Sequence, residues 1–301
     1  MRHTRKMMTD YAFGVEKVAH TLDGDKTGWH AVRRTDMTGK MALLGMAKDN
    51  YSIVPNKELV DTAREAFTNL KANDYEEKLF CTLGGSRFYG EYTFKDRTID
   101  IPKVGDTIGL RLTLNNSYDR SCKVGFSMGF VRLVCTNGMV TNSRDYDFNQ
   151  LHSGKVPIAD AQDAIKNAFQ GFNADSMAIF GKMAHQDIDQ KQGEIIVDNM
   201  AIESLVSATA RDSVKMIWAD PTHQNADASR NLFNLYNAFT QHLTHSPSAG
   251  YEKFENSRKT SRKVFNQFER LTTKDNILEE WSVRFPEKPK KKKKVEVVVE
   301  A

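Results

Sequence analysis

The sequence has few of the residues and segments that mark secreted, membrane-spanning or disulfide-linked proteins. Only three cysteines occur in 301 residues, at positions 81, 122 and 135, and no two of them form a Cys-x-x-Cys pair. An odd number of cysteines with no export signal predicts buried thiols in a reducing cytoplasm. No apolar run approaches the roughly 20 residues that a membrane helix needs. We therefore expect a cytoplasmic protein with no membrane contact.

Signatures of catalysis are equally scarce. The glycine-bearing segment 84–90 lacks the Lys-Ser/Thr ending of a phosphate-binding loop, and we interpret it as a hairpin turn. His242 and His245 lie one helical turn apart, without a neighbouring acid or cysteine to complete a tetrahedral metal site. Asp145 and Asp147 could share a strand face, but two carboxylates without a third ligand are weak evidence for Mg²⁺. We therefore predict no catalytic residue, no metal and no cofactor.

The basic charge is concentrated at one end of the chain. The sequence holds 43 Lys and Arg against 39 Asp and Glu, a net charge of +4. Residues 288–301 contain six lysines and two glutamates, which leaves 37 basic and 37 acidic side chains in residues 1–287. A body without net charge can bind nucleic acid only through a local patch or with help from the tail. The tail itself would add a strongly salt-dependent attraction to phosphate.

Residues 80–140 carry the strongest strand signal. Leu110, Leu112 and Leu114 alternate with polar residues, which is the pattern of a half-buried strand. Turn-forming residues at 84–85 and 115–119 favour antiparallel returns of the chain, and Gly125 and Gly129 indicate a bulge, a bend or a close backbone approach. We expect four strands, roughly over Phe80–Leu83, Arg87–Phe94, Thr107–Asn115 and Cys122–Cys135.

Helical periodicity dominates the rest of the chain. Asn56 is expected to cap a helix that ends near Leu70, after a short strand over 51–56. Further helices are expected within residues 158–172, 195–218, 232–243 and 251–271. Residues 1–30 look irregular, with Trp29 closing the edge of the core. This order predicts an α+β fold, in which an antiparallel β meander packs against a mainly helical C-terminal half.

Three segments follow from this pattern. Residues 1–150 form a mixed N-terminal segment and the meander, and residues 151–285 form a helical part packed on the sheet as one compact unit. Residues 286–301 form a disordered, lysine-rich tail.

Cations and aromatic rings are interleaved in the meander, as in proteins that hold a single nucleic-acid strand. In such proteins cations follow the phosphates while bases stack on the rings. Near the C-terminus, Arg258 and Arg262 share a helix face with Lys259 and Lys263, opposite Phe265. The alternative is that the rings form the core and the cations only solvate the surface. The candidate nucleic-acid-binding residues are Arg87, Tyr89, Arg111, Lys123, Arg132, Arg258, Arg262 and Lys263.

Four short segments resemble one protein family in the correct order. Residues 130–139, FVRLVCTNGM, resemble the R-x-V-C-x-N segment of the phage/plasmid-like proteins, a bacteriophage-associated domain of unknown function. Residues 115–119 resemble its NS-x-D-G turn, with Arg120 in place of the glycine. Residues 28–30 are similar to its P-W-H, and residues 231–240 to its LYNA-x-T helix. The resemblance spans about residues 25 to 275.

This resemblance implies a phage-borne protein of DNA replication or recombination, related to the single-strand annealing proteins RecT and Redβ. Those proteins pack a sheet on helices, form rings or filaments, and hold one strand with its bases exposed, without nucleotide hydrolysis. The implied partners are single-stranded DNA, further copies of the chain as a homo-oligomer, and a single-strand-binding protein, in the cytoplasm of a bacterial host. The alternative is a non-enzymatic phage structural or host-interaction module that does not bind DNA.

Overall fold

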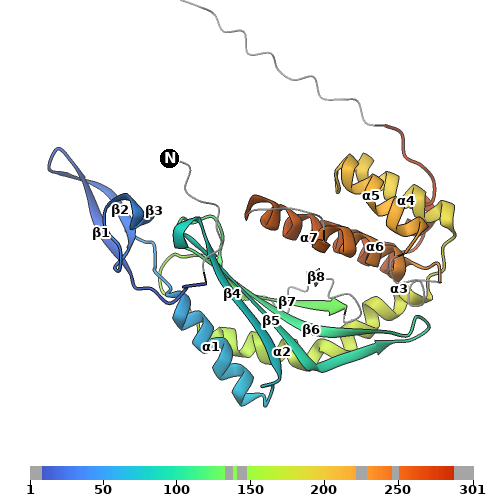
Figure 1. Ribbon diagram of the computed structural model, residues 1–301, viewed down its shortest axis with the longest axis horizontal. Helices are drawn as coiled ribbons and strands as arrows, with labels where there is room; N and C mark the ends of the chain where they lie inside the picture. The colour runs from blue at the N-terminus through green and yellow to red at the C-terminus, as the bar shows by residue number, and fades with distance from the viewer. Residues whose placement is uncertain (1–8, 133–137, 141–147, 222–228, 246–250, 288–301) are drawn as a thin grey trace, which may run out of the picture.

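Two antiparallel sheets and a set of helices make up the protein, and this arrangement confirms the α+β class (Figure 1). The computed structural model describes residues 9–132, 138–140, 148–221, 229–245 and 251–287. Strands lie in the first half of the chain and most helices in the second. The elements of the larger sheet follow one another as a meander, as predicted.

The smaller sheet is formed by β1 (Val15–Leu22), β2 (Asp25–Arg34) and β3 (Leu43–Lys48), in that order. The prediction that residues 1–30 are irregular was therefore wrong from residue 15 onward, and residues 1–8 lie outside the described residues. Most side chains of β1 and of the first half of β2 are exposed, so these strands lack the apolar alternation that reveals a half-buried strand. Asp23 and Gly24 have φ of 53° and 93°, and this turn closes the hairpin between β1 and β2. A short 3₁₀ helix, η1 (Gly39–Met41), precedes β3.

The larger sheet has six strands in the order β4-β5-β6-β7-β8, with β9 also paired to β7. Gly84 and Gly85 have φ of 69° and 106° in the 3₁₀ turn η2 (Leu83–Gly85), as expected of a glycine turn. The two longest strands extend beyond their predicted ends. The strands are β4 (Tyr75–Thr82), β5 (Arg87–Ile101), β6 (Asp106–Ser117), β7 (Val124–Arg132), β8 (Gly138–Val140) and β9 (Phe148–Gln150).

The helices agree with the predicted periodicity, with two corrections. Residues 195–218 form two helices, because Ser204 adopts a φ of 58° and Ser207 then caps the second. Asn56 lies inside the first helix, where Pro55 is the N-cap. The helical elements are α1 (Asn56–Asn69), α2 (Asp160–Ser176), the π-helical turn η4 (Met177–Gly181), α3 (Lys182–His185), α4 (Gln190–Ile202), α5 (Ala208–Ala219), α6 (Leu232–His245), α7 (Tyr251–Thr273) and α8 (Ile277–Trp281).

Asn56 is buried and acts inside the core rather than at a cap. Its amide group donates to the carbonyl oxygen of Tyr11, and its side-chain oxygen accepts from Asn116 of β6 at 2.8 Å. The predicted strand over 51–56 is reduced to an isolated bridge between Tyr51 and Ser153. The hydrogen bond between Asn56 and Asn116 ties α1 to the larger sheet. Both carboxamides are buried, and buried polar atoms need such partners.

One hydrophobic cluster connects the sheet to both groups of helices. Helices α1 and α2 cover one face of the larger sheet, α1 against β6 and α2 against β7. Phe130 of β7 is central, because its ring centroid lies 5.6 Å from that of Phe172 in α2 and 4.9 Å from that of Phe180 in η4. Phe180 in turn packs against Tyr236 of α6 and Phe265 of α7. The helical half therefore shares its core with the sheet.

Two close backbone contacts fix the surroundings of the sheet. Gly125 of β7 lies so near β9 that a Cβ there would sit 1.9 Å from the carbonyl oxygen of Phe148, which confirms the predicted close approach. Gly45 of β3 lies against the β6–β7 turn, where a Cβ would sit 2.6 Å from the carbonyl oxygen of Tyr118. The second contact docks the smaller sheet on that turn.

Candidate nucleic-acid interface

The larger sheet has two chemically different faces. On β6, the side chains of Leu110, Leu112 and Leu114 are fully buried and point toward α1 and α2, so we call their side the packed face. Arg111, Thr113 and Asn115 point to the opposite side, which we call the polar face, and all three are half-buried. The register extends the polar face onto both neighbouring strands. Its further members are Arg87, Tyr89, Glu91 and Thr93 of β5, with Gly125, Ser127 and Gly129 of β7, and the three residues of β7 are buried, so the accessible part of the polar face lies on β5 and β6.

Arg111 lies near the centre of the polar face. Its Nε donates to Oγ1 of Thr93 at 3.3 Å, and no carboxylate pairs with it within the described part of the chain. Gly109 precedes it on the same side of β6, and Gly129 faces it across β7, so neither position adds a side chain next to the guanidinium. A half-buried guanidinium with remaining N–H donors is suited to a phosphate or carboxylate ligand.

Lys123 continues the polar face toward the β6–β7 turn. The Asn115 amide group donates to the Lys123 carbonyl oxygen at 2.5 Å, and the Lys123 side chain is exposed. Asn115 lies four positions along β6 from Arg111, a span of about 14 Å at the rise of a β-strand. The structure thus brings two of the candidate cations onto one surface of β6 and its following turn.

Arg87 and Tyr89 share the polar face, as the alternation of β5 predicted, but neither is openly presented. Arg87 is 18% exposed and its Nε lies 2.7 Å from Oδ2 of Asp119, so a phosphate would have to compete with that carboxylate. Tyr89 is 2% exposed, and its ring packs at a centroid distance of 5.6 Å on Phe80, beside Leu83. A base cannot stack on a covered ring, so the expectation for Tyr89 is corrected.

The prediction that Arg132 binds nucleic acid is also corrected. It lies on the packed face at the end of β7, fully buried, and pairs with the equally buried Asp106 of β6. A buried guanidinium needs a charged partner because desolvation of a lone charge costs several kcal/mol. Arg132 therefore stabilises the sheet from within and does not reach a surface that DNA can approach.

The cations of α7 form a separate surface. Arg262 and Lys263 are exposed on the side opposite the buried Phe265, and Lys259 is exposed beside them. The Arg258 side chain lies outside the described residues. Where the structure is described, no hydrogen bond or ion pair joins these cations to the polar face. The candidate cations that reach the surface are thus divided between the polar face and α7.

Most rings of the meander belong to the core, which is the alternative that the sequence left open. The buried rings are Phe88, Tyr92, Phe94, Tyr118, Phe126 and Phe130. Base stacking by the meander therefore has no support. A different ring was missed: Trp29 of β2 is half-buried, with Arg120 and Lys48 over it. Its exposure could not be inferred while β2 and β3 were unrecognised.

Arg120 occupies the position where the resembling turn carries glycine. Its φ is 62°, a left-handed conformation that costs a residue with a Cβ about 1–2 kcal/mol. The turn geometry is thus the one that a glycine would adopt, with an arginine side chain added. That side chain is exposed and reaches the Trp29 ring.

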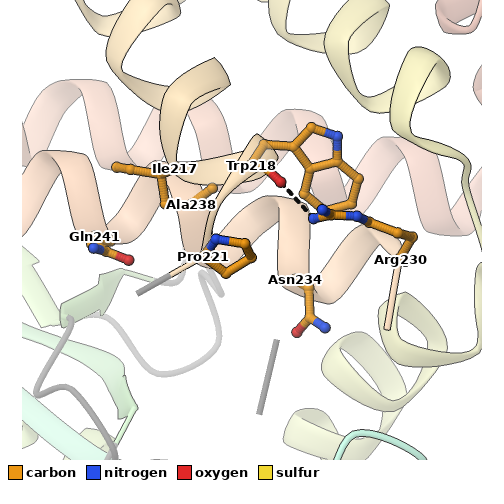
Figure 2. A pocket seen from close by; sticks show the side chains of 7 residues that line it. All are labelled: Ile217, Trp218, Pro221, Arg230, Asn234, Ala238 and Gln241. Atoms are coloured by element: carbon orange, nitrogen blue, oxygen red, sulfur yellow. Dashed lines mark hydrogen bonds between the residues drawn. The ribbon is translucent and has the colours of Figure 1, made fainter. Parts of the chain in front are cut away.

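A small pocket between α5 and α6 has a structural explanation (Figure 2). It is lined by Trp218, Arg230 and Asn234 among others. Arg230 stacks over the Trp218 ring at 4.4 Å and donates to the carbonyl oxygens of Trp218 and Ala219. These contacts satisfy the last carbonyls of α5, as a basic side chain at a helix C-terminus commonly does.

Burial favours the neutral form of three titratable side chains. Burial raises the pKa of Cys81 to about 12 and lowers the pKa of His152 and of His242. Within the described ranges, no three His, Cys, Asp or Glu side chains are grouped to hold a metal ion. Asp145 and Asp147 lie outside those ranges. No described helix is both long and apolar enough to span a bilayer.

Comparison with known proteins adds one finding. A family model described as "Domain of unknown function (DUF932)" matches residues 43–275. The chain belongs to this family. The DUF932 match begins in β3 and ends after α7, so it contains the whole polar face but not the β1–β2 hairpin with Trp29. No curated protein matches the chain, and no solved structure does.

Proposed function

We propose that this DUF932 protein binds single-stranded DNA along the polar face of its larger sheet and promotes the annealing of complementary strands without hydrolysing a nucleotide. The proposal is supported chiefly by Arg111, a half-buried cation without a carboxylate partner in the described chain. Lys123 adds a second, exposed cation along the same face. The proposed origin is a bacteriophage, and the proposed relatives are RecT and Redβ.

The polar face favours contact with the DNA backbone over contact with bases. Between the two cations lie the polar side chains of Thr113 and Asn115, which already donate to the carbonyl oxygens of Ser127 and Lys123, so Arg111 and Lys123 are the groups expected to bind phosphate. The rings expected to stack bases lie in the core instead. Bases left unstacked would remain available for pairing with a complementary strand, which is the requirement of annealing.

The polar face carries charges of both signs, so the proposal can be tested by variants that raise the affinity for DNA and by variants that lower it. Glu91 of β5 is half-buried on the same face and pairs in register with Thr113. A carboxylate there opposes a bound phosphate, while the Arg111 guanidinium attracts it. Changes at these two positions should therefore shift the affinity for DNA in opposite directions.

The direct test is the anisotropy of a labelled 30-nucleotide oligonucleotide, titrated with protein over a series of salt concentrations. For a single strand, log K falls with log salt by about 0.7 per phosphate contact. We expect Arg111→Ala to weaken binding and to reduce that slope by about 0.7. A chain ending at Glu287 separates this effect from the attraction of the lysine tail.

Two matched variants control this measurement. Glu91→Gln should tighten binding, because it removes a negative charge from the polar face without changing the side-chain shape. Lys166→Ala should leave binding unchanged, because Lys166 is exposed on α2, which covers the packed face. An Arg111→Ala protein with unaltered affinity and salt slope would contradict the proposed contact.

Annealing itself requires a second assay. Wild-type protein should accelerate pairing of two complementary oligonucleotides in the absence of ATP and of divalent ions. Mass determination with and without DNA tests the accompanying proposal that copies assemble into a ring or filament, and a labelled single-strand-binding protein tests that proposed partner. Binding without faster pairing would reduce the proposal to DNA binding alone.

A second function, a phage structural or host-interaction module that does not bind DNA, is favoured by the absence of net charge in residues 1–287. It predicts that a chain ending at Glu287 retains no oligonucleotide even at low salt. That result, with the full-length chain binding only through its tail, would replace our first proposal.

A further inference from the structure

Trp29 differs from the other tryptophans in its accessibility. The chain has three, and Trp218 and Trp281 are only 1% and 5% exposed. Trp29 is half-buried on β2, directly across from Lys48 of β3 in the register of the smaller sheet. An accessible indole is a large flat apolar surface on which a planar ligand can stack.

Two exposed cations lie over this indole. The Arg120 guanidinium carbon is 5.3 Å from the centroid of the Trp29 ring, and Lys48 Nζ is 5.7 Å from it. Neither cation has a carboxylate partner within the described ranges. Asp119, the residue before Arg120, is paired with Arg87 instead. The contact of each cation with the ring is weak, since cation–π contacts at exposed sites are modest.

A buried counterpart shows what a structural cation–ring contact looks like in the same protein. The Arg34 guanidinium carbon lies 3.8 Å from the Phe13 ring centroid, and the Arg34 side chain is 1% exposed. The carboxylates of Asp10 and Asp36 accept hydrogen bonds from Arg34 and neutralise its charge. In the group formed by Trp29, Arg120 and Lys48, which we call the Trp29 group, the cations lie farther from the ring, are exposed and have no carboxylate partner among the described residues. They can therefore exchange the ring for a ligand.

The position of the Trp29 group connects it to the polar face. Arg120 belongs to the turn between β6 and β7, which starts after Ser117 and leads through Lys123 into β7. The turn also contacts Gly45 of β3, so the smaller sheet is held against it. A strand that follows Arg111, Asn115 and Lys123 toward this turn would next meet Arg120 and the indole.

We propose that Trp29 is a stacking platform for one base of a bound single strand, and that Arg120 and Lys48 bind the phosphates beside that base. This inference rests on the function proposed above and deepens it by adding a base contact outside the larger sheet. A base that stacks on the indole displaces one of the two cations from the ring, and the displaced cation meets the negative backbone. Stacking of this kind is tolerant of sequence, because every base has a flat face.

Tryptophan fluorescence tests the inference directly in the full-length protein. Because Trp29 is the one accessible indole of the three, titration with oligo(dT) should quench the emission, and Trp29→Phe should abolish the quench while keeping most of the affinity. An oligonucleotide made mainly of abasic sites should bind without quenching. Quenching by the abasic strand would overturn the stacking claim.

Removal of the ring gives the size of the effect. Trp29→Leu should weaken oligonucleotide binding about tenfold, within the range of about 1–3 kcal/mol measured for loss of one stacked base. Trp29→Phe should restore most of the loss, and the thermal midpoints of both variants report whether they fold. Folded Trp29→Leu protein with wild-type affinity would overturn the inference and leave the polar-face proposal intact.

Arg120→Gly separates binding from stability. Glycine relieves the left-handed conformation at this position, so the thermal midpoint should stay the same or rise while the affinity for DNA falls several-fold. A merely structural Arg120 would show no loss of affinity. If the wild-type chain binds no oligonucleotide, both this inference and the proposed function fail, whereas an Arg111-dependent slope without an effect of Trp29 or Arg120 refutes this inference alone.

Discussion

Arg111 and Arg132 lie on neighbouring strands of one sheet, yet they serve opposite purposes. Arg132 points to the packed face, is fully buried and is neutralised by Asp106. Arg111 points to the polar face, is half-buried and meets only a threonine hydroxyl within the described structure. The difference teaches that the face of a strand, and not the presence of a cation, decides whether an arginine can bind a ligand.

The same contrast applies along β6 as a whole. Its leucines fill the core against α1 and α2, while the residues between them keep hydroxyl, amide and guanidinium groups on the polar face. β7 shows the limit of this rule, because every one of its nine residues is buried. A strand that is covered on both sides carries no useful alternation of exposure.

The largest expected effect is at the buried ion pair. Asp106→Asn removes the charge that compensates Arg132 and leaves a buried guanidinium without its carboxylate, which should lower the free energy of unfolding by about 3–5 kcal/mol. Urea denaturation followed by circular dichroism measures this. Arg87→Gln, which breaks the partly exposed pair with Asp119, is the matched control and should cost about 1 kcal/mol or less. Equal losses would show that the two faces do not differ.

A slightly smaller effect is expected from truncations on β6. Leu112→Ala should lower the free energy of unfolding by about 2–5 kcal/mol, because it opens a cavity in a fully packed core. Thr113→Ala, one residue further on the polar face, loses a 3.3 Å hydrogen bond to the Ser127 carbonyl and should cost about 1 kcal/mol. The same denaturation series compares them. A larger loss at Thr113 would reverse our assignment of the faces.

The smallest effect on the fold is expected from chemical modification of the cysteines, which probes how accessible the packed face is. Cys81 lies in β4 on the packed face, and its burial raises its pKa to about 12, so its thiol stays protonated and covered at pH 8. An alkylating reagent should modify the half-buried Cys122 at pH 8 while Cys81 reacts only after unfolding. Peptide mapping by mass spectrometry distinguishes the sites. Rapid modification of Cys81 in native protein would show that the packed face opens readily.

Sequence reasoning was most successful where a signal is local. The alternation of leucines in β6, the glycine turn at 84–85 and the apolar stripes of the helices each depend on neighbours a few residues apart, and all were found. The smaller sheet was missed because its first two strands are largely exposed and carry little apolar pattern. The two cations over Trp29 were not foreseen for the same reason.

The sequence by itself determined the α+β class, the antiparallel meander followed by helices, the absence of net charge in residues 1–287 and the shared face of Arg87 and Tyr89. Only the tertiary structure decided which cations remain accessible. Arg132 is buried in an ion pair with Asp106, and the Tyr89 ring is covered by Phe80. The Trp29 ring, in contrast, is contacted by Arg120 from the turn between β6 and β7. The physical reason is that burial and ion pairing depend on residues that come together only when the chain folds, and spacing along the sequence carries no record of them.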